Sequence, residues 1–203
     1  MGGVMQTHKE QVLEAIARHV IKAYNPSLLI SPQAIPIEKL IGAHNLEIDY
    51  QYIRKNGRVL GETVFDDIVI PIYDKEKEEY SLISVKRGTI LADASLLQPR
   101  MAGRLRFTLA HELSHWLIHQ EIYTGTGENA AMTKKPLKSS EANAAIERQA
   151  DRLACFLLMP AGQVKMAFHR SRSLADPATS LAQLFEVSRQ AMDIRLRDLR
   201  LTH

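Results

Sequence analysis

Two histidines four residues apart, with a glutamate directly after the first, mark a site that could bind a metal ion. His111, Glu112 and His115 form the pattern HExxH within residues 106–120. On an α-helix, four residues advance by about 400° and about 6 Å, so both imidazoles project from one face toward a single ion. Glu112 lies about 100° round the same helix, where its carboxylate can act as a general base. The pattern is therefore typical of a metal centre that performs hydrolysis.

A catalytic zinc site uses protein ligands at three positions and keeps the fourth open, so HExxH needs one more donor. His119 stands eight residues after His111, about 12 Å along the helix axis, and is expected to end the helix instead. Glu121 and Glu128 belong to a glycine-containing stretch that offers no rigid platform for a ligand. The downstream candidates are His119, Glu121, Glu128, Glu141, Glu147, Asp151 and His169.

Glu147 is the favoured third ligand because it lies in the middle of a strongly helical run, residues 141–159. Asp151 follows four residues later on the same helical face, so one carboxylate can bind metal while the other supports it. Metal-bound histidines usually donate their second ring N–H to a carboxylate, which fixes the tautomer and the ring orientation. Asp151 fits that supporting position.

The two segments resemble the signatures of a known family. HExxH followed by ExxxD on a second helix resembles the gluzincin zinc peptidases, and more closely the ImmA/IrrE-type metallopeptidases. The letters RFTLAHELSHW at residues 106–116 and IERQADRLACFLLMP at residues 146–160 are similar to that family's two signatures. Weaker similarity extends over residues 35–201. Ser114 replaces the usual glycine, and we expect it to tighten packing without removing metal binding.

The site predicts a hydrolytic mechanism in which the three ligands hold Zn²⁺, which lowers the pKa of bound water to roughly 7. Glu112 would take the proton of that water during attack on a peptide carbonyl and then donate it to the departing amine. The same donors suit Mn²⁺, Fe²⁺ or Co²⁺ as well. A donor to the developing oxyanion is also expected, with Tyr123 and His169 as candidates.

The resemblance implies a substrate class, namely a bacterial or phage-type helix-turn-helix transcriptional repressor that is cleaved to derepress stress-response or mobile-element genes. A competing hypothesis retains the predicted fold but not the peptidase activity. In that hypothesis the chain is a regulatory protein that binds a repressor or DNA, and its metal site is structural or sensory.

Composition sets bounds on the rest of the chain. With 203 residues, of which 45% are hydrophobic, it is long enough to bury the core of one domain. The single cysteine, Cys155, excludes an internal disulfide framework and favours a reducing compartment, for which the cytoplasm is the default. Cys155 lies about 12 Å from Glu147 along the helix, so we expect a buried hydrophobe there instead of a ligand.

Charge and hydropathy exclude some classes of protein. No apolar run approaches the roughly 20 residues that span a bilayer, and the N-terminus lacks a secretory signal, so the sequence predicts a soluble protein without membrane partners. The net charge of +3 and the isoelectric point near 9.0 are mildly basic. Charge alone identifies no partner, because nucleic-acid binders concentrate it in one stripe.

Periodicity predicts the elements that position the site. Helices are expected over residues 8–24, ended by Asn25-Pro26, and over residues 36–43. Short strands are expected at residues 46–50, 59–65, 68–73, 80–85 and 89–92, with a tight turn at Asn56-Gly57 and a solvated hairpin tip at residues 74–79. This order predicts an α+β fold with a small antiparallel or mixed sheet before the helices of the metal site.

Residues 99–119 are predicted to form the metal-binding helix, whose buried side comprises Leu105, Leu109, Leu113 and Trp116. Residues 120–139 lack periodicity and are either a lid or a surface loop. A sheet edge near this helix would let an extended substrate add itself as a strand, although the sequence does not identify that edge.

The C-terminal segment has two interpretations. After a short helix at residues 164–168, residues 181–185, a turn at Glu186-Val187 and a helix capped by Ser188 somewhat resemble a helix-turn-helix. The favoured interpretation is packing against the catalytic helices, which leaves DNA binding as the lesser alternative. It assigns apolar contacts to Leu181, Leu184, Val187, Met192, Leu196 and Leu199, and pairs Arg189, Arg195 and Arg197 with Asp193 and Asp198.

We therefore expect residues 1–34 to form an N-terminal helix and linker. Residues 35–170 would form the metallopeptidase-like domain that the resemblance implies. Residues 171–203 would form a C-terminal helical segment packed on that domain.

Overall fold

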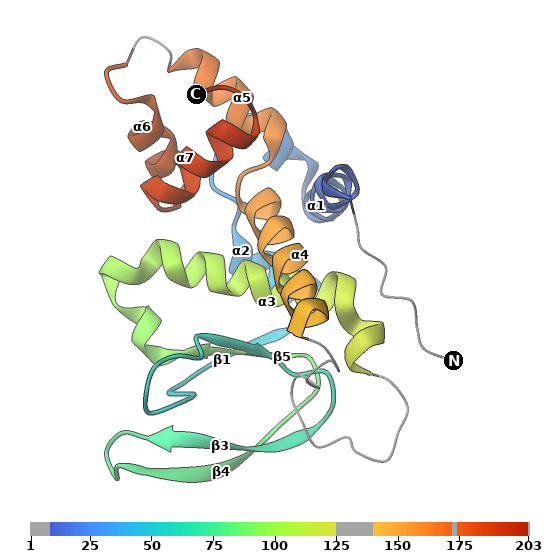
Figure 1. Cartoon of the computed structure of the whole chain (residues 1–203), viewed down its shortest axis with the longest axis vertical. Helices are drawn as coiled ribbons and strands as arrows, with labels where there is room; N and C mark the ends of the chain where they lie inside the picture. Colours follow the sequence, from blue (N-terminus) through green and yellow to red (C-terminus); the bar gives the residue numbers. More distant parts are fainter. Residues whose placement is uncertain (1–8, 125–139, 172–173, 203) are drawn as a thin grey trace.

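The computed structural model describes residues 9–124, 140–171 and 174–202. Strands lie in the first half of the chain and helices dominate the second (Figure 1). Before the strands come α1 (Glu10–Tyr24), the 3₁₀ helix η1 (Pro26–Leu29) and α2 (Ile37–Ala43). The strands are β1 (Glu47–Gln51), β2 (Gly61–Thr63), β3 (Ile68–Asp74), β4 (Glu79–Val85) and β5 (Thr89–Asp93). The 3₁₀ turns η2 (Ala94–Leu97) and η3 (Pro99–Met101) precede α3 (Ala102–Tyr123), α4 (Ser140–Leu158), α5 (Ala161–Arg170), α6 (Pro177–Phe185) and α7 (Arg189–Asp198).

The α+β class that the sequence predicts is confirmed. In Figure 1, α3 and α4 occupy the middle of the molecule, with the strands on one side and α1 with α5–α7 on the other. Within the described residues, no helix combines the length and the apolar character that crossing a membrane requires.

The strands form one mixed sheet and a separate hairpin. In the mixed sheet, ordered β1-β5-β2, β5 pairs in parallel with β1 and antiparallel with β2. Every residue of the central strand β5 is buried, which is typical of a strand covered on both faces. Strands β3 and β4 pair antiparallel through the predicted hairpin, with residues 75–78 exposed at its tip.

Strand β2 is shorter than predicted. The sequence pattern covers residues 59–65, whereas the regular ladder covers Gly61–Thr63. Single hydrogen bonds extend the pairing at both ends, from Asp93 N to Leu60 O and from Val64 N to Thr89 O, each 2.9 Å long. The alternating pattern therefore identifies the strand but not where its regular register ends.

The end of α1 and the start of α7 follow the predicted signals. The Asn25 side chain accepts a hydrogen bond of 3.0 Å from Ser27 N, so the residue that ends α1 also caps η1. The Ser188 hydroxyl accepts one of 3.1 Å from Ala191 N, as the sequence predicts for the start of α7. Glu186 adopts the left-handed region with φ of 53°, which makes the turn between α6 and α7.

The main apolar core joins residues of α1–α7 and β5, and a smaller one lies between the hairpin and β5. On α3, Leu109 and Leu113 are fully buried, and Leu105 and Trp116 pack partly buried against the same core, as predicted. Cys155 is buried, which is also predicted. Its burial raises the pKa of the thiol to about 11.

The C-terminal helices pack onto this core largely as predicted. Leu181, Met192 and Leu196 are buried, while Val187 and Leu199 are partly buried against the same core. For Leu184 the prediction is wrong, because the side chain is 43% exposed. Successive helical residues turn by about 100°, which places Leu184 on the flank of α6, away from its buried face.

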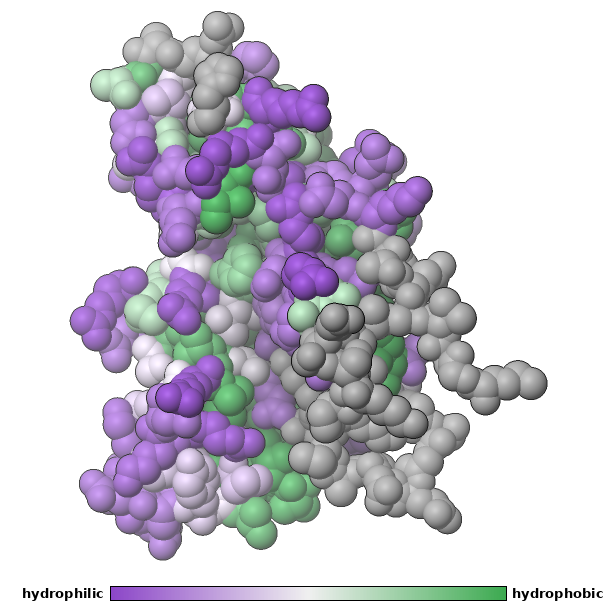
Figure 2. Space-filling view, viewed as in Figure 1, coloured by the Kyte–Doolittle hydropathy of each residue, from purple (hydrophilic) through white to green (hydrophobic). Residues whose placement is uncertain are grey.

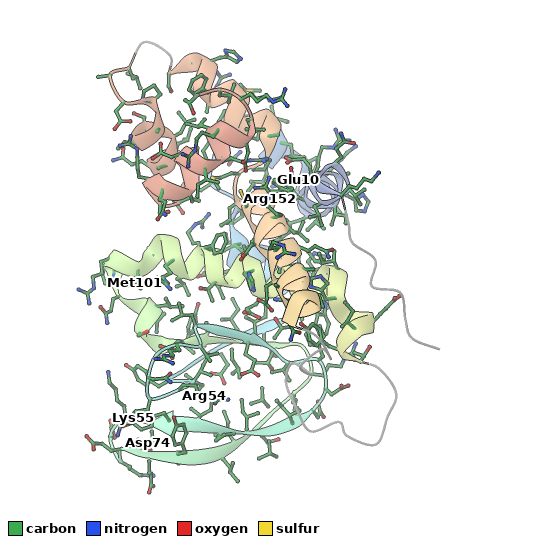
Figure 3. All side chains as sticks on the ribbon, in the orientation of Figure 1. Glu10, Arg54, Lys55, Asp74, Met101 and Arg152 are labelled. Carbon is green, nitrogen blue, oxygen red and sulfur yellow. The ribbon has the colours of Figure 1, made fainter. Side chains whose placement is uncertain are left out.

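The predicted pairing of the tail arginines is only partly correct. Arg189 Nε lies 3.3 Å from Asp193 Oδ2, as expected. Asp198 instead accepts a bond of 2.6 Å from Arg152 on α4, which also pairs with Glu10 on α1 (Figure 3). Arg195 points into the core and pairs with α1, because it lies on the buried face of α7 that also carries Met192 and Leu196.

Candidate metal centre

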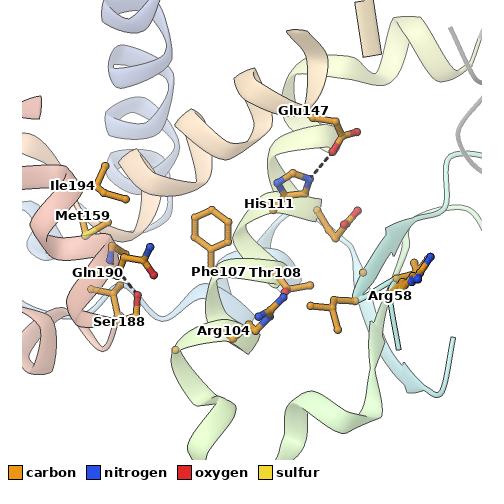
Figure 4. A pocket seen from close by; sticks show the side chains of 17 residues that line it. Arg58, Arg104, Phe107, Thr108, His111, Glu147, Met159, Ser188, Gln190 and Ile194 are labelled. Carbon is orange, nitrogen blue, oxygen red and sulfur yellow. Dashed lines mark hydrogen bonds and ion pairs between the residues drawn. The ribbon is translucent and has the colours of Figure 1, made fainter. Parts of the chain in front are cut away.

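Helices α3 and α4 bring two imidazoles and one carboxylate to a single point (Figure 4). His111 Nε2 lies 3.0 Å from His115 Nε2 and 3.2 Å from Glu147 Oε2, and His115 Nε2 lies 3.6 Å from the same oxygen. Tetrahedral bonds of about 2.1 Å place zinc ligands about 3.4 Å apart. These donors therefore have the chemistry and the spacing to hold a first-row metal ion.

Buried residues fix the two helices on which these donors lie. On α3, Leu109 and Leu113 are fully buried, and on α4, Ala150 and Leu153 are as well. Ser114 is also buried, and its hydroxyl donates a bond of 2.7 Å to the Ala110 carbonyl one turn earlier. The polar atom that distinguishes serine from glycine is thus satisfied within the helix.

Asp151 lies where the sequence places a supporting carboxylate. Its Oδ1 is 2.9 Å from His111 Nδ1, so the imidazole can donate there while its Nε2 faces Glu147. Burial lowers the pKa of His111, but the hydrogen bonds with Asp151 and Glu147 outweigh it and raise the pKa to about 9. The surroundings of this imidazole therefore favour positive charge.

His119 does not end its helix, which corrects the sequence prediction. Helix α3 continues to Tyr123, whose ring stacks on Phe65 with centroids 4.8 Å apart and anchors the last turn. His119 is 2% exposed, and its Nδ1 lies 3.1 Å from His115 Nδ1. His119 contacts His115 on the side of the ring away from Glu147. The spacing of four residues between the two histidines could have indicated this contact.

The carboxylate of Glu112 is held by strand β2. Glu112 is 3% exposed, and the Thr63 hydroxyl lies 2.8 Å from its Oε2 and 2.9 Å from its backbone oxygen. A Cβ atom on Gly61 would lie 2.8 Å from Glu112 Oε1 and 2.7 Å from a methyl carbon of Thr108. Strand β2 can approach α3 this closely because Gly61 has no side chain.

The other ligand candidates named from the sequence do not contribute to the described metal centre. Glu121 is exposed on the last turn of α3. Glu128 and the side chain of Glu141 lie outside the described part of the chain, as does most of the predicted lid or loop. His169 is exposed at the end of α5 and does not line the cleft beside the metal centre.

Tyr123, the other candidate oxyanion donor, lies close to the centre. Its ring centroid is 6.0 Å from that of His115. Burial and the carboxylates of Glu147 and Glu112 raise the pKa of its phenol, which keeps the hydroxyl protonated and able to donate.

A cleft of about 770 Å³ opens beside these residues. Its walls come from β2 and the preceding loop, from the first half of α3, and from α7. Figure 2 shows the surface indented at the left, between the C-terminal helices and α3. The contribution of α7 was missed by sequence reasoning, because no local pattern indicates which exposed helical face will lie opposite a site far away in the sequence. The lining residues nearest the metal centre are Gly61, Phe107, Thr108, His111, Glu112 and Glu147.

The site combines two histidines on α3, the buried Glu112 between them in sequence, and Glu147 on α4. This combination of fold and site defines a metallopeptidase-like class. A family model described as the IrrE N-terminal-like domain, peptidase family M78, matches residues 96–197. The chain belongs to this family, which supports a metallopeptidase role and confirms the resemblance seen in the sequence. A search of curated proteins found no match.

Proposed function

We propose that the protein is a metal-dependent endopeptidase and that its metal is zinc. The observation that carries this proposal is the meeting of His111 Nε2, His115 Nε2 and Glu147 Oε2 within 4.8 Å of one another. Glu112 lines the cleft at the same point. Two imidazoles and one carboxylate form the donor set of many zinc hydrolases.

A bound zinc ion supplies positive charge that polarises a peptide carbonyl and lowers the pKa of water. Glu112 accepts the proton of the attacking water and passes it to the departing amine. Thr63 holds one oxygen of that carboxylate, which fixes its direction relative to the histidines. Tyr123 does not line the cleft, but it is the candidate donor to the oxyanion because its ring centroid lies 6.0 Å from that of His115 and its phenol stays protonated.

Strand β2 supplies a surface that an extended substrate can use. Within the described residues it pairs with β5 alone, so it forms one edge of the mixed sheet. Leu60 and Gly61 line the cleft beside Glu112. A substrate strand added along this edge would place its backbone beside the metal centre through main-chain hydrogen bonds.

We further propose that the substrate is a helix-turn-helix transcriptional repressor, cleaved in the cytoplasm to release stress-response or mobile-element genes. Membership of the IrrE N-terminal-like family supports this choice. The position of α7 supports a protein substrate over DNA. Gln190 and Ile194 of that helix and its N-cap Ser188 line the proposed peptidase cleft, and Arg189 forms ion pairs with Asp176 and Asp193.

Incubation of the zinc-loaded protein with a helix-turn-helix repressor encoded beside its gene tests the proposal. We expect defined fragments, identified by mass spectrometry, that disappear with Glu112→Gln and with a chelator. Glu121→Gln, an exposed change on the same helix, is the matched control and should leave the fragments unchanged. Release of the repressor from its operator by Glu112→Gln, without cleavage, would contradict the peptidase and favour the binding hypothesis.

A further inference from the structure

The cleft beside the metal centre contains two arginines whose charges are not neutralised within the described part of the chain. Arg58 lies in the loop before β2, and Arg104 lies two turns before His111 on α3 (Figure 4). Both side chains are exposed, and neither guanidinium pairs with a described carboxylate. Nearby Arg106, in contrast, lies 3.2 Å from Glu186. Two unpaired guanidinium groups in one cleft favour a carboxylate ligand.

The opposite wall of the same cleft carries several apolar side chains beside the polar Ser188 and Gln190. Phe107 lies one turn before His111, with ring centroids 6.5 Å apart, so this wall begins next to a proposed metal ligand. Met159 follows α4, and Ala191 and Ile194 belong to α7. Figure 4 shows Met159 and Ile194 beyond Phe107, on the side away from Arg58.

Ile194 is a large apolar residue of this wall that is exposed to solvent. Its side chain is 41% exposed although α7 has a buried face available to apolar residues. Covering a large apolar side chain that is exposed inside a cleft stabilises the bound state, because apolar surface is removed from water. Leu184 is 43% exposed on neighbouring α6 but does not line this cleft.

We propose that the cleft selects an extended peptide segment carrying an acidic residue and a large apolar residue near the bond to be cut. Arg58 and Arg104, from separate walls of the cleft, attract the acidic side chain by their charge, while Phe107 and Ile194 contact the apolar one. Helix α7 is then a substrate-reading element. This inference deepens the proposed function, on which it rests, by naming the substrate class of the same site.

Retention of peptides from a random library by zinc-loaded Glu112→Gln measures this selectivity without requiring turnover. Mass spectrometry of the retained peptides should show enrichment of Asp or Glu together with Leu, Ile, Met or Phe. The double change Arg58→Glu and Arg104→Glu, made in that background, should weaken retention of acidic peptides by about tenfold and favour Lys and Arg instead. Ile194→Gln should weaken retention of apolar peptides by at least about threefold.

Two matched controls test whether these effects belong to the cleft. Arg100→Glu reverses an exposed charge on the turn before α3, outside the cleft, and should leave acidic enrichment unchanged. Leu184→Gln should leave apolar enrichment unchanged for the same reason. Equal effects of control and test changes would overturn the inference, because they would reflect overall charge or stability.

Digestion of the same library by the wild-type protein separates this inference from the peptidase proposal. Cleavage without acidic or apolar preference would overturn the inference and leave the peptidase intact. Arginine-dependent retention without any cleavage would support the inference and contradict the peptidase. Retention of acidic and neutral peptides to the same extent by Glu112→Gln would overturn the inference directly.

Discussion

At the centre of the proposed active site, a side chain from one element orients a side chain from another. Thr63 on β2 lies within hydrogen-bond distance of the Glu112 carboxylate on α3. No motif in the sequence marks Thr63, because its role depends on how strand and helix pack. By contrast, helical spacing pairs His111 with His115 and Glu147 with Asp151, the family resemblance joins the two pairs, and the structure brings them together.

Removal of the Thr63 hydroxyl should slow turnover while the protein keeps its metal. A hydrogen bond to a charged group contributes about 1.5–3 kcal/mol, so Thr63→Val should lower kcat by roughly 10–100-fold. Thr63→Ser restores the donor and should recover most of the rate. Steady-state kinetics with metal analysis checks this, and an unchanged kcat for Thr63→Val would refute the positioning role.

The pKa of His111 predicts a proton release when metal binds. In the metal-free protein that pKa is raised from 6.5 to about 9, so at neutral pH the imidazole carries a proton that the metal must displace. Calorimetry at about pH 7.5, in buffers with different ionisation enthalpies, should show about one proton released per metal ion bound. The release should diminish as the pH rises through 9. Buffer-independent binding heats would contradict this.

At the scale of elements, the close approach of β2 to α3 makes Gly61 a sensitive position. In Gly61→Ala the new methyl would lie within 2.8 Å of Glu112 Cγ and Oε1, which should destabilise the fold by about 1–3 kcal/mol and displace the carboxylate. Chemical denaturation and kinetics measure the two effects. Gly42→Ala, with nothing within 4 Å of its new Cβ, is the control and should be neutral or stabilising. Equal behaviour of the two variants would refute the packing argument.

The order and type of elements could be predicted, whereas their contacts could not. Period and capping signals locate the strands, the metal-binding helix and the Ser188 cap, because these depend on neighbouring residues. The end of α3 was misplaced because Tyr123 is anchored by Phe65, a contact between distant segments. The cleft wall on α7 was missed for the same reason.

At the scale of the whole molecule, buried Arg195 joins the two ends of the chain. Its guanidinium donates bonds of 2.8 and 2.7 Å to the Glu14 carboxylate and one of 3.0 Å to the Met159 carbonyl. It also lies 4.5 Å from the Phe156 ring centroid. The sequence predicted partners on the same helix, but α1 provides the carboxylate that reaches this buried charge.

Loss of Glu14 should therefore be far more damaging than loss of its exposed neighbour Glu10. Glu14→Ala leaves a buried arginine without its counter-charge and should lower the free energy of unfolding by about 3–5 kcal/mol. Glu10→Ala removes an exposed pair with Arg152 and should change it by about 0–1 kcal/mol. Urea denaturation of both variants measures these changes. Similar midpoints would show that the burial of Arg195 does not require the Glu14 carboxylate.

The central claim is that His111, His115 and Glu147 bind one metal ion while Glu112 acts on the substrate. Elemental analysis of purified, zinc-loaded wild type, Glu112→Gln and Glu147→Ala tests it most directly. Wild type and Glu112→Gln should each hold about one zinc ion per chain, and Glu147→Ala should lose most of it. Full zinc occupancy in Glu147→Ala would contradict the account.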